Sequence, residues 1–379
     1  MASSQQRVIV AMVDGFGWEY WEATPMPRLR RMAETGLFRE VRAMFPSVTN
    51  VNNVSICCGA WPAQHGIIGN SYYDPSSQGA VYMNSADLIR CPTLFQRAAQ
   101  HGLKSALLTS KRKTIELLSR ETVVAVAAEC PSEEWIAQLG PPADIYSREI
   151  NYWLWEAAIT LLQRRPDIQV IYVHTTDYPM HTWAPEAAES QEHLARLDEL
   201  IGRACDVAPD AALYLTADHS MNFKTRAWDL TRALEKRGCP IQFALSPERD
   251  YYIKHHRNLA GCSYVWLNDL EDESRVRQGL SELVGVEEVL SREQAVDRFN
   301  LPQERVGDLV VLADRDTMLG DLETEFEELP PTYRNHGSLY EFRVPLLIHN
   351  PQGMLPPVDT FQHNKDLTRS LFRETTEKS

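Results

Sequence analysis

Three aspartates and three histidines stand at points in the chain where metal ligands could gather. Two pairs and two single residues make up the set: Asp177 with His181 in Thr-Thr-Asp-Tyr-Pro-Met-His, Asp218 with His219 in Ala-Asp-His-Ser, Asp14 in Val-Asp-Gly-Phe-Gly, and His336 in Asn-His-Gly-Ser. Carboxylate and imidazole ligands without a thiolate suit zinc or a similar divalent ion. The set therefore predicts a pair of such ions, which together could stabilise the entering and leaving groups of a displacement at phosphorus.

Each of these motifs also has a plain structural interpretation. Asp14 could cap the helix that follows it, and the pair Asp218 and His219 could belong to a turn. A lone histidine such as His336 is commonly a core or surface residue with no ligand. One turn of helix or a compact loop would bring the acid and the imidazole of the first pair to one ion. The complete set is much more specific than any of its members.

A hydroxyl group that could serve as nucleophile lies in the segment Phe-Pro-Ser-Val-Thr-Asn-Val-Asn-Asn-Val-Ser-Ile, where Thr49 stands just before a predicted helix. Its structural interpretation is a helix N-cap. A helix N-terminus also receives a phosphoryl group well, because its free N–H groups and the helix dipole favour an anion. A hydroxyl deprotonated by a metal ion at this place can act as a nucleophile.

The elements that must position these residues are short apolar runs that alternate with helical patterns. Runs rich in Val, Ile and Leu are typical of central strands in a parallel sheet covered on both faces, and ligands bind at the carboxyl ends of such strands. The sequence therefore predicts an α/β fold with a mostly parallel sheet flanked by helices. The expected strands are 8–13, 170–173, 211–215, 309–312 and 344–348, and the expected helices are 27–35, 93–101 and 150–164.

The pattern changes between residues 225 and 319, where charged helical stretches mix with short strand-like pieces. We interpret 225–319 as a small inserted α+β cap, and 1–224 with 320–379 as the metal-binding hydrolase core. Within this cap we expect helices at 227–237 and 273–283 and a strand at 264–267.

Composition and charge exclude several classes of protein. The 379 residues are 44% hydrophobic and 24% charged, which is typical of a globular chain, and the net charge of -14 argues against a nucleic-acid binder. A small anionic substrate is not excluded, because a metal pair reverses the local field. No apolar run approaches the roughly 20 residues of a membrane span, and the seven cysteines form no CxxC pair. We therefore expect a cytoplasmic protein that binds no membrane, and the oligomeric state, a homodimer included, stays open. The polar stretch 364–379 predicts a frayed end.

In their order and context, these segments resemble the alkaline phosphatase superfamily, specifically its nucleotide pyrophosphatase/phosphodiesterase-like branch, over residues 8–220 and again around residue 336. The resemblance implies two metal sites and two Zn²⁺ ions as the cofactor. It assigns one ion to Asp14, Thr49, Asp218 and His219, and the other to Asp177, His181 and His336.

A narrower resemblance, to the phosphonoacetate hydrolase family, is carried by three runs: Pro-Ser-Val-Thr-Asn-Val-Asn-Asn-Val-Ser-Ile at 46–56, His-Gly-Ile-Ile-Gly-Asn at 65–70 and Thr-Ser-Lys-Arg-Lys at 109–113. It implies that Asn70 contacts a phosphoryl oxygen and that Lys111 and Lys113 bind the carboxylate of the substrate. Structurally, Asn70 could instead be a turn residue, and the lysines could form a solvated basic patch on a loop. Lys224 is a second-choice substrate contact.

The reaction implied by this resemblance is hydrolysis of the carbon–phosphorus bond of phosphonoacetate to acetate and phosphate, through a phosphothreonine at Thr49. The sequence Ser-Met-Asn-Phe-Lys after His219 departs from the glycine usual there, which bears on the substrate and leaves the metal ligands intact. A phosphodiesterase, nucleotide pyrophosphatase or phosphomonoesterase with the same ions is the alternative. A catalytically silent binding protein would be expected to have lost ligands or nucleophile, and none is lost.

Overall fold

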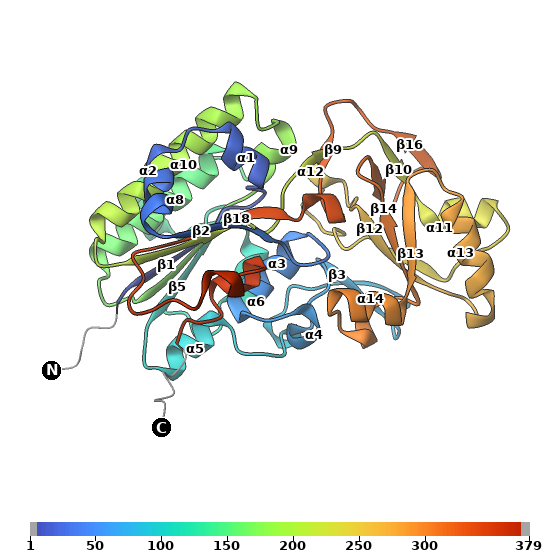
Figure 1. Cartoon of the computed structure of the whole chain (residues 1–379), viewed down its shortest axis with the longest axis horizontal. Coiled ribbons are helices and arrows are strands. Elements are labelled where there is room, and N and C mark those ends of the chain that lie inside the picture. Colours follow the sequence, from blue (N-terminus) through green and yellow to red (C-terminus); the bar gives the residue numbers. More distant parts are fainter. Residues whose placement is uncertain (1–5, 373–379) are drawn as a thin grey trace.

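The structure, a computed structural model, describes residues 6–372 and has a core around a seven-stranded sheet with a smaller body beside it (Figure 1). The strand order is β2-β18-β8-β1-β7-β5-β6. The five strands from β8 to β6 are parallel, whereas β18 is antiparallel to both of its neighbours. The predicted α/β fold with a mostly parallel sheet is confirmed. The strands are β1 (Val8–Met12), β2 (Leu37–Arg42), β5 (Ser105–Thr109), β6 (Val124–Ala127), β7 (Val170–His174), β8 (Ala212–Thr216) and β18 (Arg343–His349).

Helices cover both faces of this sheet, and every residue of β1, β5, β7 and β8 is buried. Strands covered on both faces need apolar side chains in both directions, which explains their continuous apolar runs. Figure 1 shows α1, α2, α8, α9 and α10 on one face and α3 to α6 on the other, while α7 packs against α8. The helices are α1 (Trp18–Ala23), α2 (Pro27–Thr35), α3 (Thr49–Cys58), α4 (Pro62–His65), α5 (Leu94–Gln100), α6 (Arg112–Leu118), α7 (Glu133–Leu139), α8 (Glu149–Arg164), α9 (Tyr178–Thr182) and α10 (Ala188–Val207).

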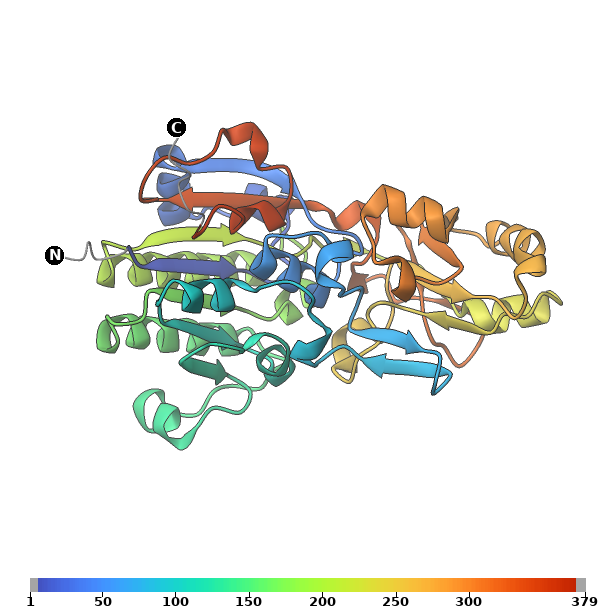
Figure 2. The same ribbon diagram turned by 90° about the horizontal axis from the view of Figure 1, so that it is seen from below.

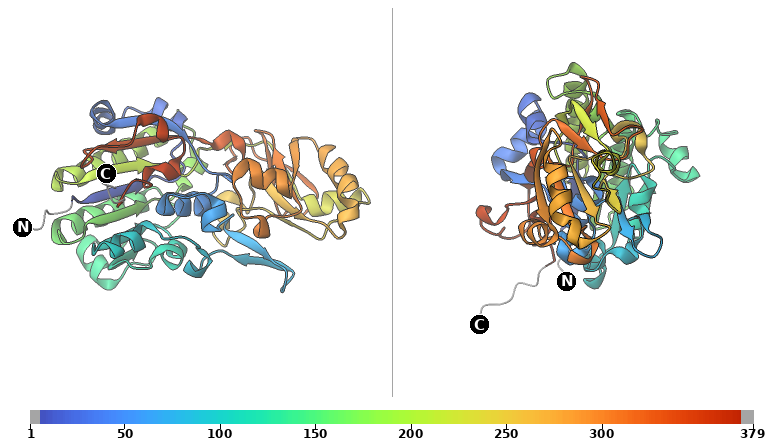
Figure 3. Two further views of the ribbon diagram at one scale, coloured as in Figure 1. Left: turned by 60° about the horizontal axis from the view of Figure 1, so that its bottom comes forward. Right: turned by 90° about the vertical axis from the view of Figure 1, so that its right-hand side faces the viewer.

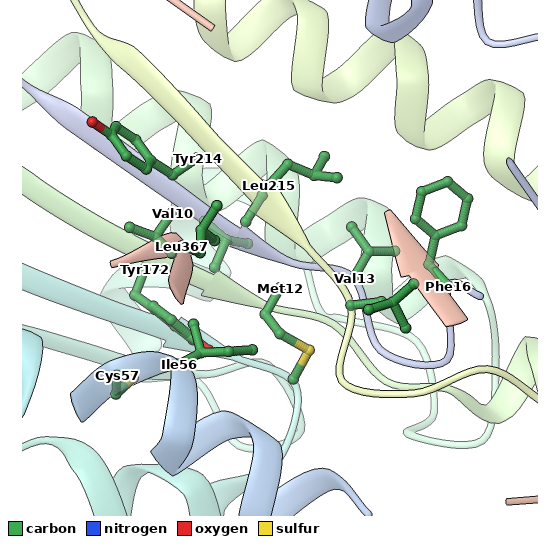
Figure 4. Packing of buried hydrophobic residues seen from close by; sticks show 14 of the residues in the cluster. Val10, Met12, Val13, Phe16, Ile56, Cys57, Tyr172, Tyr214, Leu215 and Leu367 are labelled. Atoms are coloured by element: carbon green, nitrogen blue, oxygen red, sulfur yellow. The ribbon is translucent and has the colours of Figure 1, made fainter. Parts of the chain in front are cut away.

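The core packs closely behind the strand ends that carry the candidate site. Val10 and Met12 of β1 and Tyr172 of β7 lie with Ile56 of α3 and with Leu367 from the end of the chain (Figure 4). All five side chains are fully buried. Dense packing of this kind holds the backbone rigidly, so the residues that follow β1 and β7 start from fixed positions.

The polar end of the chain is part of this packing as far as the structure describes it. The Asn364 amide donates to Asn52 Oδ1 (2.8 Å) and to the carbonyl of Ala217 (3.1 Å), and Leu367 is fully buried. The expectation of a frayed end is therefore wrong for 364–372, because these side chains satisfy buried groups of α3 and of the loop after β8. Residues 373–379 lie outside the described residues.

The second body adjoins the carboxyl ends of the core strands, with the β3–β4 hairpin beside it (Figures 2 and 3). Its sheets have the orders β11-β12-β14-β13 and β15-β10-β16, and β3-β4 and β9-β17 form two-stranded ladders. The strands are β3 (Ser71–Asp74), β4 (Gly79–Tyr82), β9 (Asn222–Phe223), β10 (Arg226–Trp228), β11 (Phe243–Leu245), β12 (Cys262–Trp266), β13 (Val286–Ser291), β14 (Leu309–Ala313), β15 (Thr317–Leu319), β16 (Phe326–Glu328) and β17 (Arg334–Asn335). The helices are α11 (Leu230–Lys236), α12 (Ile253–His256), α13 (Glu273–Ser281) and α14 (Arg292–Phe299). Short 3-10 turns occur in both bodies. They are η1 (Ala86–Leu88), η2 (Leu270–Asp272), η3 (Gln303–Arg305), η4 (Leu339–Glu341), η5 (Val358–Thr360) and η6 (Asn364–Leu367).

The predicted helix at 227–237 is wrong at its start. Ala227 lies in strand β10, and α11 begins only at Leu230, where the Asp229 carboxylate accepts a hydrogen bond from the Arg232 N–H (3.0 Å). This cap satisfies a free N–H of the first turn and so sets the start of the helix. The division of the chain at 225 and 319 stays a prediction, and β10 also pairs with β16 from beyond residue 319. Among the helices of residues 6–372, none is both long and apolar enough to cross a membrane.

Candidate metal centre

Three buried aspartates follow three adjacent parallel strands. Strand β1 lies between β7 and β8, and Met12 is in register with the last residue of each. Asp14, Asp177 and Asp218 come two or three residues after these ends and are at most 2% exposed. Because parallel strands end at the same edge of a sheet, the three carboxylates converge on one place.

Two of these aspartates and a histidine form the first group of ligand atoms. The Nε2 atom of His219 lies 3.2 Å from Asp218 Oδ2 and 3.6 Å from Asp14 Oδ1. Thr49 is the first residue of α3, and its hydroxyl lies 3.5 Å from Asp14 Oδ1. Val48, not Thr49, is the N-cap residue, so the cap interpretation of Thr49 is wrong. The hydroxyl stands at a helix N-terminus beside the first group.

The third aspartate belongs to a second group. Helix α9 supplies the one turn that separates Asp177 from His181, and His181 Nε2 lies 2.8 Å from Asp177 Oδ2. His336, after β17, places its Nε2 atom 3.7 Å from the same oxygen. The rings of His336 and His219 are stacked, with centroids 3.6 Å apart. The two groups are therefore contiguous, and all seven predicted ligands lie together.

The chemistry of these groups fits divalent ions. Four of their buried atoms have no hydrogen-bond partner among the residues described: Asp177 Oδ1, His181 Nε2, Asp218 Oδ2 and His219 Nε2. Buried polar atoms are nearly always paired, so four unpaired ones in one place are what a site that binds metal ions would show. Three aspartate–histidine clusters among the described residues could each hold a metal ion. In each cluster the ligand atoms lie within 4.8 Å of one another.

Backbone carbonyls orient the three histidines. The Nδ1 atoms of His181, His219 and His336 lie 2.8, 2.9 and 2.8 Å from the carbonyl oxygens of Arg334, Ser220 and Ser47. A ring that donates from Nδ1 to a carbonyl has its Nε2 lone pair free for a metal ion. This arrangement selects the same tautomer in all three rings, with Nε2 facing the aspartates.

The buried carboxylates repel one another. Burial, followed by the charges of Asp177 and Asp218, raises the pKa of Asp14 to about 7. Burial likewise raises the pKa of Asp218 to about 6, and it lowers the pKa of His336 well below its ordinary value. Divalent cations would remove this repulsion, which is a further reason why the groups suit metal ions.

The glycine after Asp14 allows the close approach of the two groups. Gly15 has φ +72°, a conformation that side chains rarely adopt, and a Cβ atom there would meet the Asp177 Cβ at 3.0 Å. Its N–H donates to Asp218 Oδ1 (3.0 Å). The glycine thus lets the loop after β1 pass between the other two aspartates.

Sequence reasoning missed the histidine that orients Asp14. His174 ends β7, and its Nε2 atom lies 3.3 Å from Asp14 Oδ2. The Asn53 amide donates to His174 Nδ1 (3.0 Å), so the ring proton is on Nε2 and is donated to Asp14. The Tyr172 hydroxyl in turn donates to Asn53 Oδ1 (2.6 Å). The strand-end rule that selected the aspartates could have selected His174 as well.

The three predicted substrate contacts also lie at this place, and they are buried. Lys111 Nζ lies 3.9 Å from Asp14 and 3.7 Å from Asp177. Burial lowers the Lys111 pKa, but the two aspartates outweigh it and raise the pKa above its ordinary value. Lys113 Nζ donates to Asn70 Oδ1 (3.1 Å). Both lysines are only 4% exposed, so the alternative of a solvated basic patch is wrong.

Two acids from the second body, which the sequence did not single out, complete this side of the site. The Asn70 amide donates to Glu248 Oε2 (2.8 Å), and Lys113 forms an ion pair with Asp250. Both acids are buried. Lys224 is engaged elsewhere, since its ammonium donates to Glu341 (2.9 Å) and to the Arg315 carbonyl (2.8 Å). These contacts of Lys224 are therefore with neither the metal-ligand candidates nor the other predicted substrate contacts.

A family model described as type I phosphodiesterase / nucleotide pyrophosphatase matches residues 8–338. The chain belongs to this family, in the nucleotide pyrophosphatase/phosphodiesterase branch of the alkaline phosphatase superfamily. The resemblance seen in the sequence motifs is thereby confirmed.

Among solved structures, phosphonoacetate hydrolase from Sinorhizobium meliloti 1021 in complex with phosphonoacetate is similar over 96% of this chain and 94% of that chain, with 31% identity and a TM-score of 0.85. Murine ectonucleotide pyrophosphatase/phosphodiesterase 5 shares the fold, with 16% identity over 96% and 93% of the two chains and a TM-score of 0.71.

Two curated relatives match part of the chain. Venom phosphodiesterase of Naja atra is 25% identical over 232 residues, or 57% of this chain, and human ectonucleotide pyrophosphatase/phosphodiesterase family member 7 is 24% identical over 246 residues, or 60%. The matched part spans 26% and 50% of the length of these two relatives.

Proposed function

We propose that this chain is a hydrolase with two zinc ions that cleaves the carbon–phosphorus bond of phosphonoacetate. The observation that carries the proposal is the burial of two lysines at this place: Lys111, whose Nζ atom lies near Asp14 and Asp177, and Lys113, which donates to Asn70. A phosphate ester needs only the ions and an oxygen nucleophile. A substrate with a carboxylate one carbon from phosphorus also needs cations for that second charge, and two lysines meet this need. The similar structure that holds phosphonoacetate supports the same substrate.

The ions would be held by Asp14, Thr49, Asp218 and His219 and by Asp177, His181 and His336. Bound there, they would supply Lewis acid chemistry, lowering the pKa of a coordinated hydroxyl and offsetting the phosphonate charge.

Thr49 would be the residue that attacks phosphorus, because its hydroxyl stands at a helix N-terminus beside Asp14. A bond forms between its Oγ1 atom and phosphorus, the carbon–phosphorus bond breaks, and its electron pair passes to the carbon beside the carboxylate. The Thr49 hydroxyl gives up its proton as it attacks, and the carbon takes up one proton to give acetate, so the protons balance. Lys111 and Lys113 stabilise the negative charge that spreads onto the carboxylate. Water then cleaves the phosphothreonine, which releases phosphate and restores the Thr49 hydroxyl.

The test is turnover of three substrates by the zinc-loaded protein: phosphonoacetate, a nitrophenyl phosphodiester and a nitrophenyl phosphomonoester. We expect the highest kcat/KM for phosphonoacetate, with acetate and phosphate formed in equal amounts. A higher kcat/KM for either ester would contradict the proposed substrate while leaving the metal centre in place.

A phosphodiesterase or nucleotide pyrophosphatase is the second candidate. The family match and the curated relatives favour it. Thr49 and the same ions would serve that reaction, and the lysines would then contact phosphate oxygens. The two candidates differ in what Lys111 and Lys113 recognise.

A further inference from the structure

A short segment of the second body reaches the metal-ligand candidates from outside the core. It lies between β11 and β12, spans residues 246–261 and includes α12. Helix α12 packs against α9, the helix that carries His181 (Figure 1). The segment brings two adjacent histidines, His255 and His256, into the buried region, but only one of them faces the metal groups.

His255 completes a ligand group with Asp177 and His181. Its Nε2 atom lies 3.5 Å from Asp177 Oδ1, an oxygen that has no hydrogen-bond partner in the described part of the chain. The other group near this oxygen is Lys111, whose Nζ atom is 3.7 Å away. The rings of His255 and His181 have centroids 4.8 Å apart, and the ligand atoms of the three residues lie within 4.8 Å of one another.

His255 differs from the other candidate ligands in how it is held. The Nδ1 atoms of His181, His219 and His336 each meet a backbone carbonyl, whereas His255 Nδ1 is buried and has no partner within residues 6–372. Aromatic rings pack around His255 instead, with the Tyr146 ring centroid 5.6 Å away. A ligand that no second hydrogen bond orients binds its ion less firmly than one that is so oriented.

The neighbouring His256 is occupied by other contacts. Its Nδ1 atom accepts a hydrogen bond from the Asn258 N–H (3.0 Å), and its Nε2 atom faces Glu248 at 3.9 Å. It belongs to none of the three groups that could hold a metal ion among the residues described. It is therefore a matched control, with the same residue type, burial and helix.

We propose that His255 is an exchangeable fourth protein ligand of the ion held by Asp177, His181 and His336. The proposal rests on the metal-binding part of the proposed function, and it holds for either candidate substrate. A catalytic zinc site has three protein ligands and one position open to water or substrate. His255 would occupy that position in the resting protein and yield it to a phosphoryl oxygen, so that substrate binding releases a contact between the second body and the core.

Cobalt(II) is the probe, because a cysteine thiolate bound to it produces a near-ultraviolet charge-transfer band that oxygen and nitrogen ligands do not. His255→Cys loaded with two equivalents of cobalt should show this band, and wild type and His256→Cys should lack it. Inorganic phosphate should then weaken the band. His255→Cys that binds two equivalents without the band would overturn the proposal, and a band unchanged by saturating phosphate would overturn the exchangeable role.

Zinc affinity gives a second and independent readout. In a chelator competition, His255→Gln should bind one of its two zinc ions at least about tenfold less tightly than wild type does. The affinities of His256→Gln should stay within about twofold of wild type. Equal affinities for the two variants would overturn the proposal. Circular dichroism of the metal-free variants checks folding, and the glutamine variant serves if the cysteine variant misfolds. If wild type itself binds no metal, the proposed function fails before this inference is reached.

Discussion

The metal-ligand candidates and the predicted substrate contacts, which are Asn70, Lys111 and Lys113, meet in one place but are held there in different ways. Asp14, Asp177, Asp218 and His219 follow strands of a single sheet, and backbone carbonyls orient the three histidines of the set. Among the substrate contacts, Asn70 of the core donates to Glu248 of the second body, and Lys113 of the core forms an ion pair with Asp250. Backbone of a packed sheet cannot shift locally, whereas side-chain pairs between two bodies can rearrange. The difference suggests that the core determines whether chemistry occurs and that contacts between the bodies determine the substrate.

Removal of the metal ions should have the largest effect. A chelator should abolish turnover of every substrate and added zinc should restore it, because the Thr49 hydroxyl is a poor nucleophile without a Lewis acid. His336→Ala should lower the bound zinc from two ions towards one without unfolding the chain, since the residue follows a short strand pair at the site. Elemental analysis and turnover are the measurements. Full activity in a protein without metal would contradict the view that the metal-ligand candidates of the core determine whether chemistry occurs.

Loss of the proposed nucleophile should come next. Thr49→Ala should reduce kcat by about a thousandfold or more on phosphonoacetate and on esters alike, while most of the zinc is retained. Thr49→Ser keeps a hydroxyl and is the matched control, with a much smaller loss expected. If the alanine variant kept more than roughly a tenth of the rate, water would be the attacking group.

The lysines should separate substrates from one another. Lys111→Ala and Lys113→Ala should each lower kcat/KM for phosphonoacetate by about ten- to a hundredfold, equivalent to about 1.5–3 kcal/mol for a charge-assisted contact. A phosphodiester without the carboxylate should lose much less. Equal losses on both substrates would assign the lysines to phosphate binding or to structure, and no loss on phosphonoacetate would favour the phosphodiesterase.

The smallest expected effect is on the stability of the metal-free protein. The pKa values of Asp14 and Asp218, about 7 and about 6, lie above the unfolded value of 3.8. From about pH 4 to 7 the unfolded chain has lost protons that the folded chain keeps, so the free energy of unfolding falls as the pH rises and levels off above 7.

Thermal melts with and without zinc at several pH values test this. Zinc should raise Tm more at pH 7.5 than at pH 5. At pH 5 zinc must displace protons from the aspartates, whereas at pH 7.5 the acids are mostly ionised and zinc removes their repulsion. Asp14→Asn imitates the protonated acid, so its metal-free form should lose less stability across this range than wild type. Parallel pH profiles for the two proteins would show that the aspartates are not the source of the effect.

Local sequence pattern was sufficient for the fold class and for the seven metal-ligand candidates. Continuous apolar runs indicate buried parallel strands, and the residues that follow them lie at one edge of the sheet, which is why Asp14, Asp177 and Asp218 could be grouped without coordinates. The helix at 27–35 matches α2 residue for residue, because its apolar positions follow a helical period.

Only the tertiary structure decided what surrounds these candidates. Asn70 and Glu248 are 178 residues apart, and His255 meets Asp177 only because α12 packs on α9. Periodicity and spacing describe the few residues that share an element, and they contain no information about which distant segment covers a strand end. The same limit applied to Lys111 and Lys113, whose motif resembled a substrate clamp. Their burial, and the pairing of Lys113 with Asp250 of the second body, came only from the folded structure.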